Sequence, residues 1–176
     1  MSLIYGLTVF FVVLFIFKMT SNVDYRKILT NHYFSIIVLG FLVRALAVLM
    51  LPSFESDLVA FKQIVLQSVS VDSYSNIYET NTIVSFPPLN LYFFYVIGLI
   101  NSIFGFNYEG STFEFFLKLP AIICDLVLAV ELYKIACKKI NKKMAWYIGL
   151  AYAFNPAIIL MGSVWGQYES VYTVLM

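Results

Sequence analysis

Five apolar runs constrain this chain more than any other feature of its sequence. They cover residues 3–17, 34–51, 89–106, 115–137 and 144–162, and they are close to the roughly 17–25 residues that a helix needs to cross a bilayer. Only 12% of the residues are charged, about half the share found in a soluble domain. The sequence therefore predicts an all-α protein, a polytopic helix bundle of the cell membrane.

The charges between these runs indicate an orientation. Three basic residues and one acid separate the first two runs, and residues 138–143 contain four lysines. Positively charged connections favour the cytoplasmic side, so both segments are predicted to be cytoplasmic. Residues 52–86 carry four acids against the single base Lys62. This acidic segment is predicted to lie outside.

The run at 89–106 is predicted not to cross, because a crossing there would place the four-lysine segment outside. An interfacial helix, a re-entrant hairpin and a buried helix pair remain open alternatives. Pro87-Pro88, Gly98 and Gly105 would fit a break. We expect one transmembrane domain over 1–176 with about four spanning helices, an outer region at 52–114 that contains interfacial or re-entrant helices, and further helices beyond residue 176.

The first acidic motif follows the second apolar run directly, as Glu55-Ser56-Asp57. One interpretation is structural, because a Ser-Asp pair before Leu58 and Phe61 has the spacing of an N-cap on a short amphipathic helix. The other is chemical, with a carboxylate at the membrane edge acting as a general base. The sequence leaves both open.

A second polar motif lies in and after the last apolar run. Asn155-Pro156 predicts a kink in that helix, and Trp165, Gln167 and Glu169 follow at its outer end. The tryptophan is also typical of an interfacial belt. The topology predicts that Glu169 lies on the same side of the membrane as Asp57.

Two further groups of residues have two interpretations each, and a third group has one. An aromatic and proline cluster is either an interface anchor or a slot for an isoprenoid chain or a sugar ring. It contains Tyr78, Phe86, Pro87, Pro88, Leu89, Tyr92 and Tyr95. Arg44 and Asp125 are costly inside a membrane, so they are predicted to bridge helices, with binding of a lipid phosphate by Arg44 as the alternative. Glu131 and Lys134 are helical neighbours that can pair.

Several functional classes are excluded or disfavoured. The chain contains one histidine, His32, which rules out a histidine-based triad or a multi-histidine metal site. The net charge is +1, so no basic field predicts nucleic-acid binding. No metal site is assigned and no cofactor is required by the sequence, although a divalent cation stays open.

Taken in order, the motifs resemble those of a known family. They are Ser56-Asp57 with Phe61, Tyr78, Phe86-Pro87-Pro88 with Tyr92, Lys118-Leu119-Pro120-Ala121 with Asp125, Asn155-Pro156, and Trp165-Gly166-Gln167-Tyr168-Glu169. In this order the chain resembles the N-terminal portion of GT-C class integral-membrane glycosyltransferases, in particular bacterial mannosyltransferase-like proteins related to the GPI mannosyltransferases.

The resemblance implies transfer of a sugar, with mannose as the candidate, from a polyprenyl-phosphate donor to an acceptor on the extracytoplasmic face. It implies Asp57 and Glu169 as catalytic residues, and substrate binding by Glu55, Tyr78, Pro87, Pro88, Tyr92, Trp165 and Gln167. Glu169 replaces the family's usual Asp, and the chain lacks the distal half of such enzymes. The alternative is therefore a non-catalytic membrane subunit or a truncated pseudoenzyme, with membrane lipid and a second chain that completes the fold as partners.

Overall fold

The computed structural model describes residues 31–70 and 88–176, and all regular structure in these residues is helical. The predicted all-α class is thus confirmed for this part of the chain. The apolar run at 3–17 and two predicted substrate-binding residues, Tyr78 and Pro87, lie outside the described residues.

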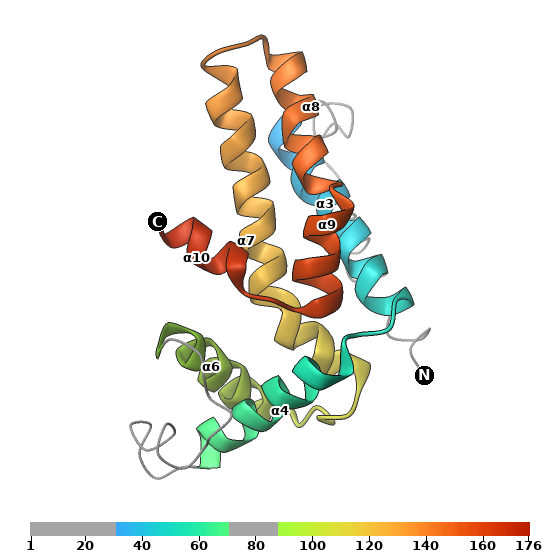
Figure 1. Cartoon of the computed structure of the whole chain (residues 1–176), viewed down its shortest axis with the longest axis vertical. Coiled ribbons are helices and arrows are strands. Elements are labelled where there is room, and N and C mark those ends of the chain that lie inside the picture. The colour runs from blue at the N-terminus through green and yellow to red at the C-terminus, as the bar shows by residue number, and fades with distance from the viewer. Residues whose placement is uncertain (1–30, 71–87) are drawn as a thin grey trace, which may run out of the picture.

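The helices form an upright bundle with a pair of helices laid across one end (Figure 1). The bundle consists of α3 (His32–Met50), α7 (Ser111–Cys137), α8 (Lys142–Ala153), and α9 (Pro156–Ile159), which continues into the π-helix η2 (Leu160–Trp165). The crossing pair is α4 (Glu55–Ser70) and α6 (Pro88–Phe104), and α10 (Glu169–Leu175) packs against α7.

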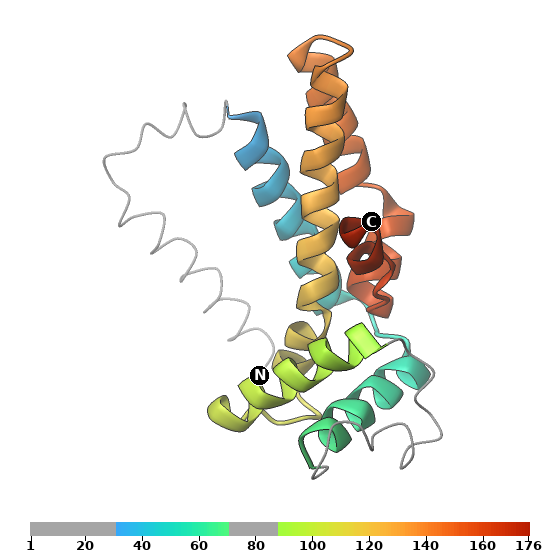
Figure 2. The same ribbon diagram turned by 90° about the vertical axis from the view of Figure 1, so that its left-hand side faces the viewer.

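The apolar run at 89–106 forms one continuous helix, α6. The predicted break is therefore wrong, and the re-entrant hairpin with it. Pro88 starts the helix, where its missing N–H costs nothing, and Gly98 serves close packing, since a Cβ there would lie 2.5 Å from Val69 Cγ2 of α4. Gly105, at φ +66°, follows the end of the helix. Figure 2 shows α6 lying across the bundle rather than along it, and an interfacial position of this helix stays a prediction.

The last apolar run is broken as predicted at Asn155-Pro156. The α8 helix and the α9–η2 segment meet at 42°. Asn155 is the N-cap of α9, and its side-chain oxygen accepts a hydrogen bond from the Ala157 N–H over 2.9 Å. The side chain thus satisfies a free donor of the new helix, whereas a proline kink alone would have left a carbonyl to satisfy.

Candidate spanning helices are fewer than the sequence predicts. Within the described residues, α3 alone is long and apolar enough to cross a membrane, and α8 with α9–η2 meets the same standard as one bent unit. The 27-residue α7 contains Glu114, Lys118, Asp125, Glu131 and Lys134, and this number of charges keeps it outside the standard. The multi-pass arrangement therefore remains a prediction.

The two ends of the bundle differ in charge as the sequence predicts. The lysines of residues 138–143 lie in the turn between α7 and α8 and at the start of α8, and this turn is at the end opposite to α4 and α6 (Figure 1). At the other end an apolar core joins α4, α6, α7 and α10 through Phe61, Phe94, Leu117 and Tyr168. The acidic motif of α4 is thus held at the end remote from the lysines.

Candidate functional site

Asp57 links α4 to the end of the broken helix. Its Oδ2 accepts hydrogen bonds from Trp165 Nε1 at 2.6 Å and from Gln167 Nε2 at 2.7 Å. Its Oδ1 has a longer contact of 3.4 Å with Ser56 Oγ. Hydrogen bonds to a charged acceptor are stronger than those between neutral groups, so these two bonds hold α4 firmly against the end of the broken helix. We call the arrangement of Asp57, Trp165 and Gln167 the Asp57 clamp.

The N-cap interpretation of Ser56-Asp57 is wrong, because α4 already begins at Glu55. Asp57 lies instead in the first turn, where the helix dipole stabilises its negative charge. The amphipathic pattern of the helix is confirmed: Leu58, Phe61 and Val65 are all buried. Burial of this face directs Asp57 toward the bundle.

A buried lysine lies next to the clamp, close to Gly166. Lys118 of α7 is 1% exposed, and its Nζ donates to Ser53 Oγ over 2.6 Å. A Cβ on Gly166, which has φ +84°, would lie 3.2 Å from the Lys118 side chain. The sequence indicates Lys118 only as a member of a motif. A lysine inside an apolar run does not indicate which side chain it will contact, so the hydrogen bond to Ser53 was not predicted.

Ser53 connects this lysine to a wider charged network. Its hydroxyl donates to Glu114 at 3.2 Å, and Lys62 of α4 lies within ion-pair distance of Glu109 and Glu114. Lys62 and Lys118 are both almost fully buried. The network ties α4, α7 and the segment that precedes α7 into one unit around the clamp.

Arg44 of α3 and Asp125 of α7 form a buried ion pair, with 3.4 Å between Nε and Oδ2. The Arg44 Nη1 donates to the Ala153 carbonyl over 2.6 Å, so one side chain connects three helices. Arg44 is fully buried, which leaves it no surface for a lipid phosphate. Glu131 and Lys134 also pair, near the other end of α7.

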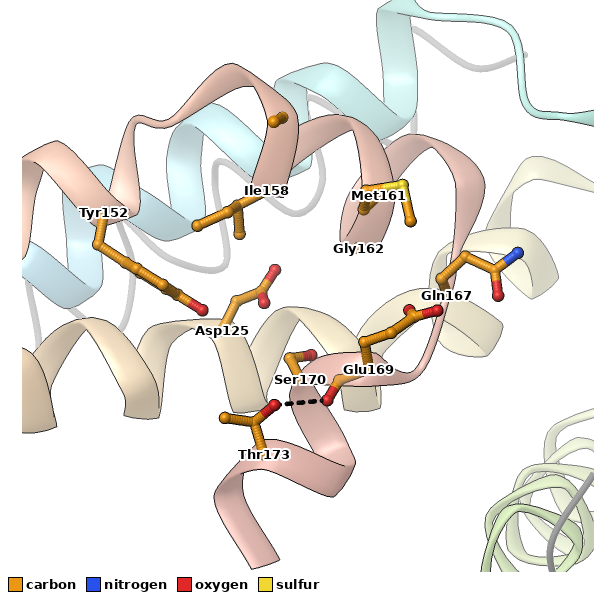
Figure 3. Close-up of a pocket in the computed structure, with 10 residues that line it drawn as sticks. Asp125, Tyr152, Ile158, Met161, Gly162, Gln167, Glu169, Ser170 and Thr173 are labelled. Carbon is orange, nitrogen blue, oxygen red and sulfur yellow. Dashed lines mark hydrogen bonds between the residues drawn. The ribbon is translucent and has the colours of Figure 1, made fainter. Parts of the chain in front are cut away.

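A cavity of about 260 Å³ lies beside the clamp, between α7, the α9–η2 segment and α10 (Figure 3). Gln167 belongs to both, since its side-chain amide donates to Asp57 and the residue also lines the cavity. Asp125 and Glu169 lie in the wall as well. The structure therefore places the predicted residues Glu169 and Gln167 at the cavity, while Asp57 and Trp165 remain in the clamp.

The remaining predicted substrate-binding residues lie elsewhere. Glu55 is exposed in the first turn of α4, and Pro88 and Tyr92 are exposed on α6. Sequence reasoning missed Tyr152 and Thr173, which also line the cavity, because neither belongs to a charged or motif-bearing segment. Across the described ranges, no three His, Cys, Asp or Glu side chains are grouped so that they could hold a metal ion.

Asp57 and Trp165 of the clamp, together with Asp125 of the buried ion pair, lie in a region of the chain that matches a known family model. That model describes the GPI transamidase subunit PIG-U, and it matches residues 48–166, more than half of the chain. The chain belongs to the PIG-U family. The predicted resemblance is therefore confirmed in part. The matched family is related to GPI, as expected for a relative of the GPI mannosyltransferases, but membership of the GT-C class is not shown.

The PIG-U match includes Asp57 and Trp165 but ends before Gln167 and Glu169. The family description names a subunit, which agrees with the predicted alternative of a membrane subunit better than with an independent transferase. No curated protein and no solved structure matches this chain.

Proposed function

We propose that this chain is a non-catalytic subunit of a multi-pass membrane assembly, and that it holds a lipid-linked glycan at the extracytoplasmic face while a partner chain carries out the chemistry. The name of the PIG-U family supports the subunit role. The opposite placement of the lysine turn and the Asp57 clamp supports the orientation, because positively charged connections favour the cytoplasm (Figure 1).

The observation that carries this proposal is how Asp57 uses its carboxylate. One oxygen accepts two short hydrogen bonds from side chains more than 100 positions away, so its lone pairs are occupied by structural partners. A carboxylate employed in this way fixes α4 against the end of η2. In this proposal Asp57, the residue predicted as the catalytic base, has a structural role.

A second candidate is favoured by the other oxygen of the same carboxylate. Among the described residues, Asp57 Oδ1 has only the 3.4 Å contact to Ser56, and Asp57 is half-buried rather than enclosed. In this alternative Oδ1 takes a proton from an acceptor hydroxyl, whose oxygen bonds to the anomeric carbon of the sugar, with mannose as the candidate. The bond from that carbon to the donor breaks, and polyprenyl phosphate leaves. Glu169 would then shape the polar site.

Two substitutions at one position separate the two functions. Asp57→Asn keeps an acceptor oxygen for Trp165 and Gln167 but cannot act as a base, whereas Asp57→Ala removes both properties. Each variant is expressed as the full chain in cells that lack the gene. The glycolipids are then profiled by mass spectrometry, and membranes are assayed for transfer from polyprenyl-phosphate-mannose.

The subunit proposal predicts that Asp57→Asn restores the glycolipid profile and that Asp57→Ala does not. Glu55→Gln, at the exposed neighbouring acid, serves as the matched control and is expected to behave as wild type. Equal loss in Asp57→Asn and Asp57→Ala, together with transfer that depends on the wild-type chain, would establish the transferase instead.

A further inference from the structure

The cavity between α7, the α9–η2 segment and α10 has a polar wall built by three elements. In Figure 3 the Tyr152 side chain from α8, Asp125 from α7 and Glu169 from α10 lie around the same space. Gln167, Ser170 and Thr173 complete this wall. Its volume of about 260 Å³ is just below the roughly 300–1,000 Å³ of pockets that take drug-sized ligands, so it suits one small headgroup or ring.

An apolar wall faces the polar one. Ile158 of α9 and Met161 of η2 cover the other side of the cavity (Figure 3). Gly162 keeps the space between the walls narrow, because a Cβ there would lie 2.5 Å from Asp125 Oδ2. A ligand that fits must therefore offer polar groups on one edge and C–H groups on its face.

The polar groups of the wall retain free hydrogen-bonding capacity. Glu169 is exposed, and among the described residues its carboxylate has no ion pair. Thr173 Oγ1 donates to the Glu169 carbonyl over 2.9 Å and keeps its lone pairs for a ligand. The Ser170 hydroxyl and the Gln167 amide also donate within the protein, to the Ala121 carbonyl and to Asp57. The wall therefore offers mainly acceptor oxygens to a ligand, and these match the O–H donors of a molecule with several hydroxyl groups.

Other ligand classes fit less well. The charged side chains that line the cavity, Asp125 and Glu169, are both acidic. The charge of Asp125 is balanced by its ion pair with Arg44, so Glu169 is the charge that would repel a phosphate or carboxylate. Arg44 stands behind Asp125 and is fully buried. An acyl chain would leave the polar wall without hydrogen-bond partners, which is costly.

We propose that this cavity binds one neutral, hydroxyl-rich ring, a single sugar residue of a lipid-linked glycan. This inference rests on the proposed function and deepens it, because it separates recognition of the sugar from the structural role of Asp57. Gln167 lines the cavity and donates to Asp57, so the clamp holds one side of the binding site in place.

The test is saturation-transfer NMR on the full chain in lipid nanodiscs prepared without sugar-based detergent. The probes are methyl α-D-mannopyranoside and methyl β-D-glucopyranoside, with glucosamine hydrochloride as a cationic comparison. Thr173→Val and Glu169→Gln each change one polar group of the wall. Thr112→Val and Glu131→Gln make the same changes outside the cavity and serve as matched controls.

We expect a saturable signal from at least one neutral glycoside. Binding should weaken about three- to tenfold in Thr173→Val and in Glu169→Gln, as expected for loss of one hydrogen bond, and stay unchanged in both controls. No saturable binding of either glycoside, equal binding by cavity variants and wild type, or binding of glucosamine alone would overturn the assignment.

Failure of the cavity assignment and failure of the subunit proposal give different results. If neither glycoside binds while Asp57→Asn still restores the glycolipid profile and Asp57→Ala does not, the cavity assignment fails and the subunit proposal stands. If a glycoside binds in the cavity while Asp57→Asn and Asp57→Ala lose transfer equally, the chain is a transferase whose sugar site has been located correctly.

Discussion

The indole nitrogen of Trp165 lies 2.6 Å from Asp57 Oδ2 and joins two residues that are 108 positions apart in the sequence. The bond connects the first turn of α4 to the last residue of η2. A helix laid across the end of the bundle is thereby fixed to a helix that runs along it. Gln167 adds a second hydrogen bond to the same oxygen.

Trp165→Phe tests this bond while it keeps an aromatic ring against Phe54, whose centroid is 4.8 Å away. We expect a loss of about 1.5–3 kcal/mol of stability, because a hydrogen bond to a charged acceptor is removed from a half-buried site. Trp146→Phe is the matched control, since that indole donates to the neutral Ser35 hydroxyl. Thermal unfolding in detergent should show the larger decrease for Trp165→Phe, and an equal or smaller decrease would contradict the clamp.

Gly162→Ala should destabilise the bundle because the new Cβ would lie 2.5 Å from Asp125 Oδ2. Overpacking of this kind costs about 1–3 kcal/mol. The substitution is made both in wild type and in Asp125→Ala, where the carboxylate that clashes is gone. The account predicts that the cost of Gly162→Ala falls sharply in the second background; strictly additive costs would show that the contact is not the cause.

Asn155→Ala should weaken the start of α9, because its side chain caps the Ala157 N–H. Loss of an N-cap typically costs about 1 kcal/mol. Asn141 caps α8 in the same way through the Met144 N–H, in the turn far from the site. Asn155→Ala and Asn141→Ala should lower the melting temperature similarly, but only Asn155→Ala should increase proteolysis near residues 153–160.

Tyr168 predicts a loss of stability at high pH. Burial raises the pKa of its hydroxyl above the usual range, and the nearby Tyr172 adds to the effect. In the unfolded chain this hydroxyl ionises near pH 10. The hydrogen bond from Tyr168 to the Leu117 carbonyl therefore stabilises the folded state fully below about pH 10 and progressively less above it.

The measurement is the difference in unfolding free energy between wild type and Tyr168→Phe from pH 8 to pH 11. Ionisation of the other tyrosines and the lysines is common to both proteins, so the difference isolates Tyr168. We expect the advantage of wild type to shrink as the pH rises past about 10. A difference between wild type and Tyr168→Phe that stays constant from pH 8 to pH 11 would refute the prediction.

Local patterns predicted those parts of the fold that depend on neighbours in sequence. The apolar periodicity of Leu58, Phe61 and Val65 predicted the buried face of α4, and Asn155-Pro156 predicted the bend, because capping and proline geometry act within one turn. Gly98 was misjudged for the opposite reason. Its role depends on Val69 of a different helix, and no local pattern reveals that contact.

The candidate site was predictable only as a set of residue types. Polar residues in apolar surroundings singled out Asp57, Trp165 and Glu169, since such residues need a reason to be there. Their grouping depends on where α9–η2 and α10 pack on α7, and this packing assigns Asp57 to the clamp and Glu169 to the cavity. The sequence did not predict that Tyr152 lines the cavity, because a tyrosine in an apolar helix is equally typical of a residue that only packs against its neighbours.

Both proposals depend on the Asp57 clamp and the cavity facing the same, extracytoplasmic side of the membrane. The most direct measurement is labelling of intact cells with a membrane-impermeant thiol reagent at single cysteines, in a chain without Cys124 and Cys137. Ser56, Ser111, Asn141 and Thr173 are exposed positions suited to replacement. The account predicts labelling of Ser56→Cys, Ser111→Cys and Thr173→Cys but not of Asn141→Cys, whereas labelling of Asn141→Cys from outside would contradict it.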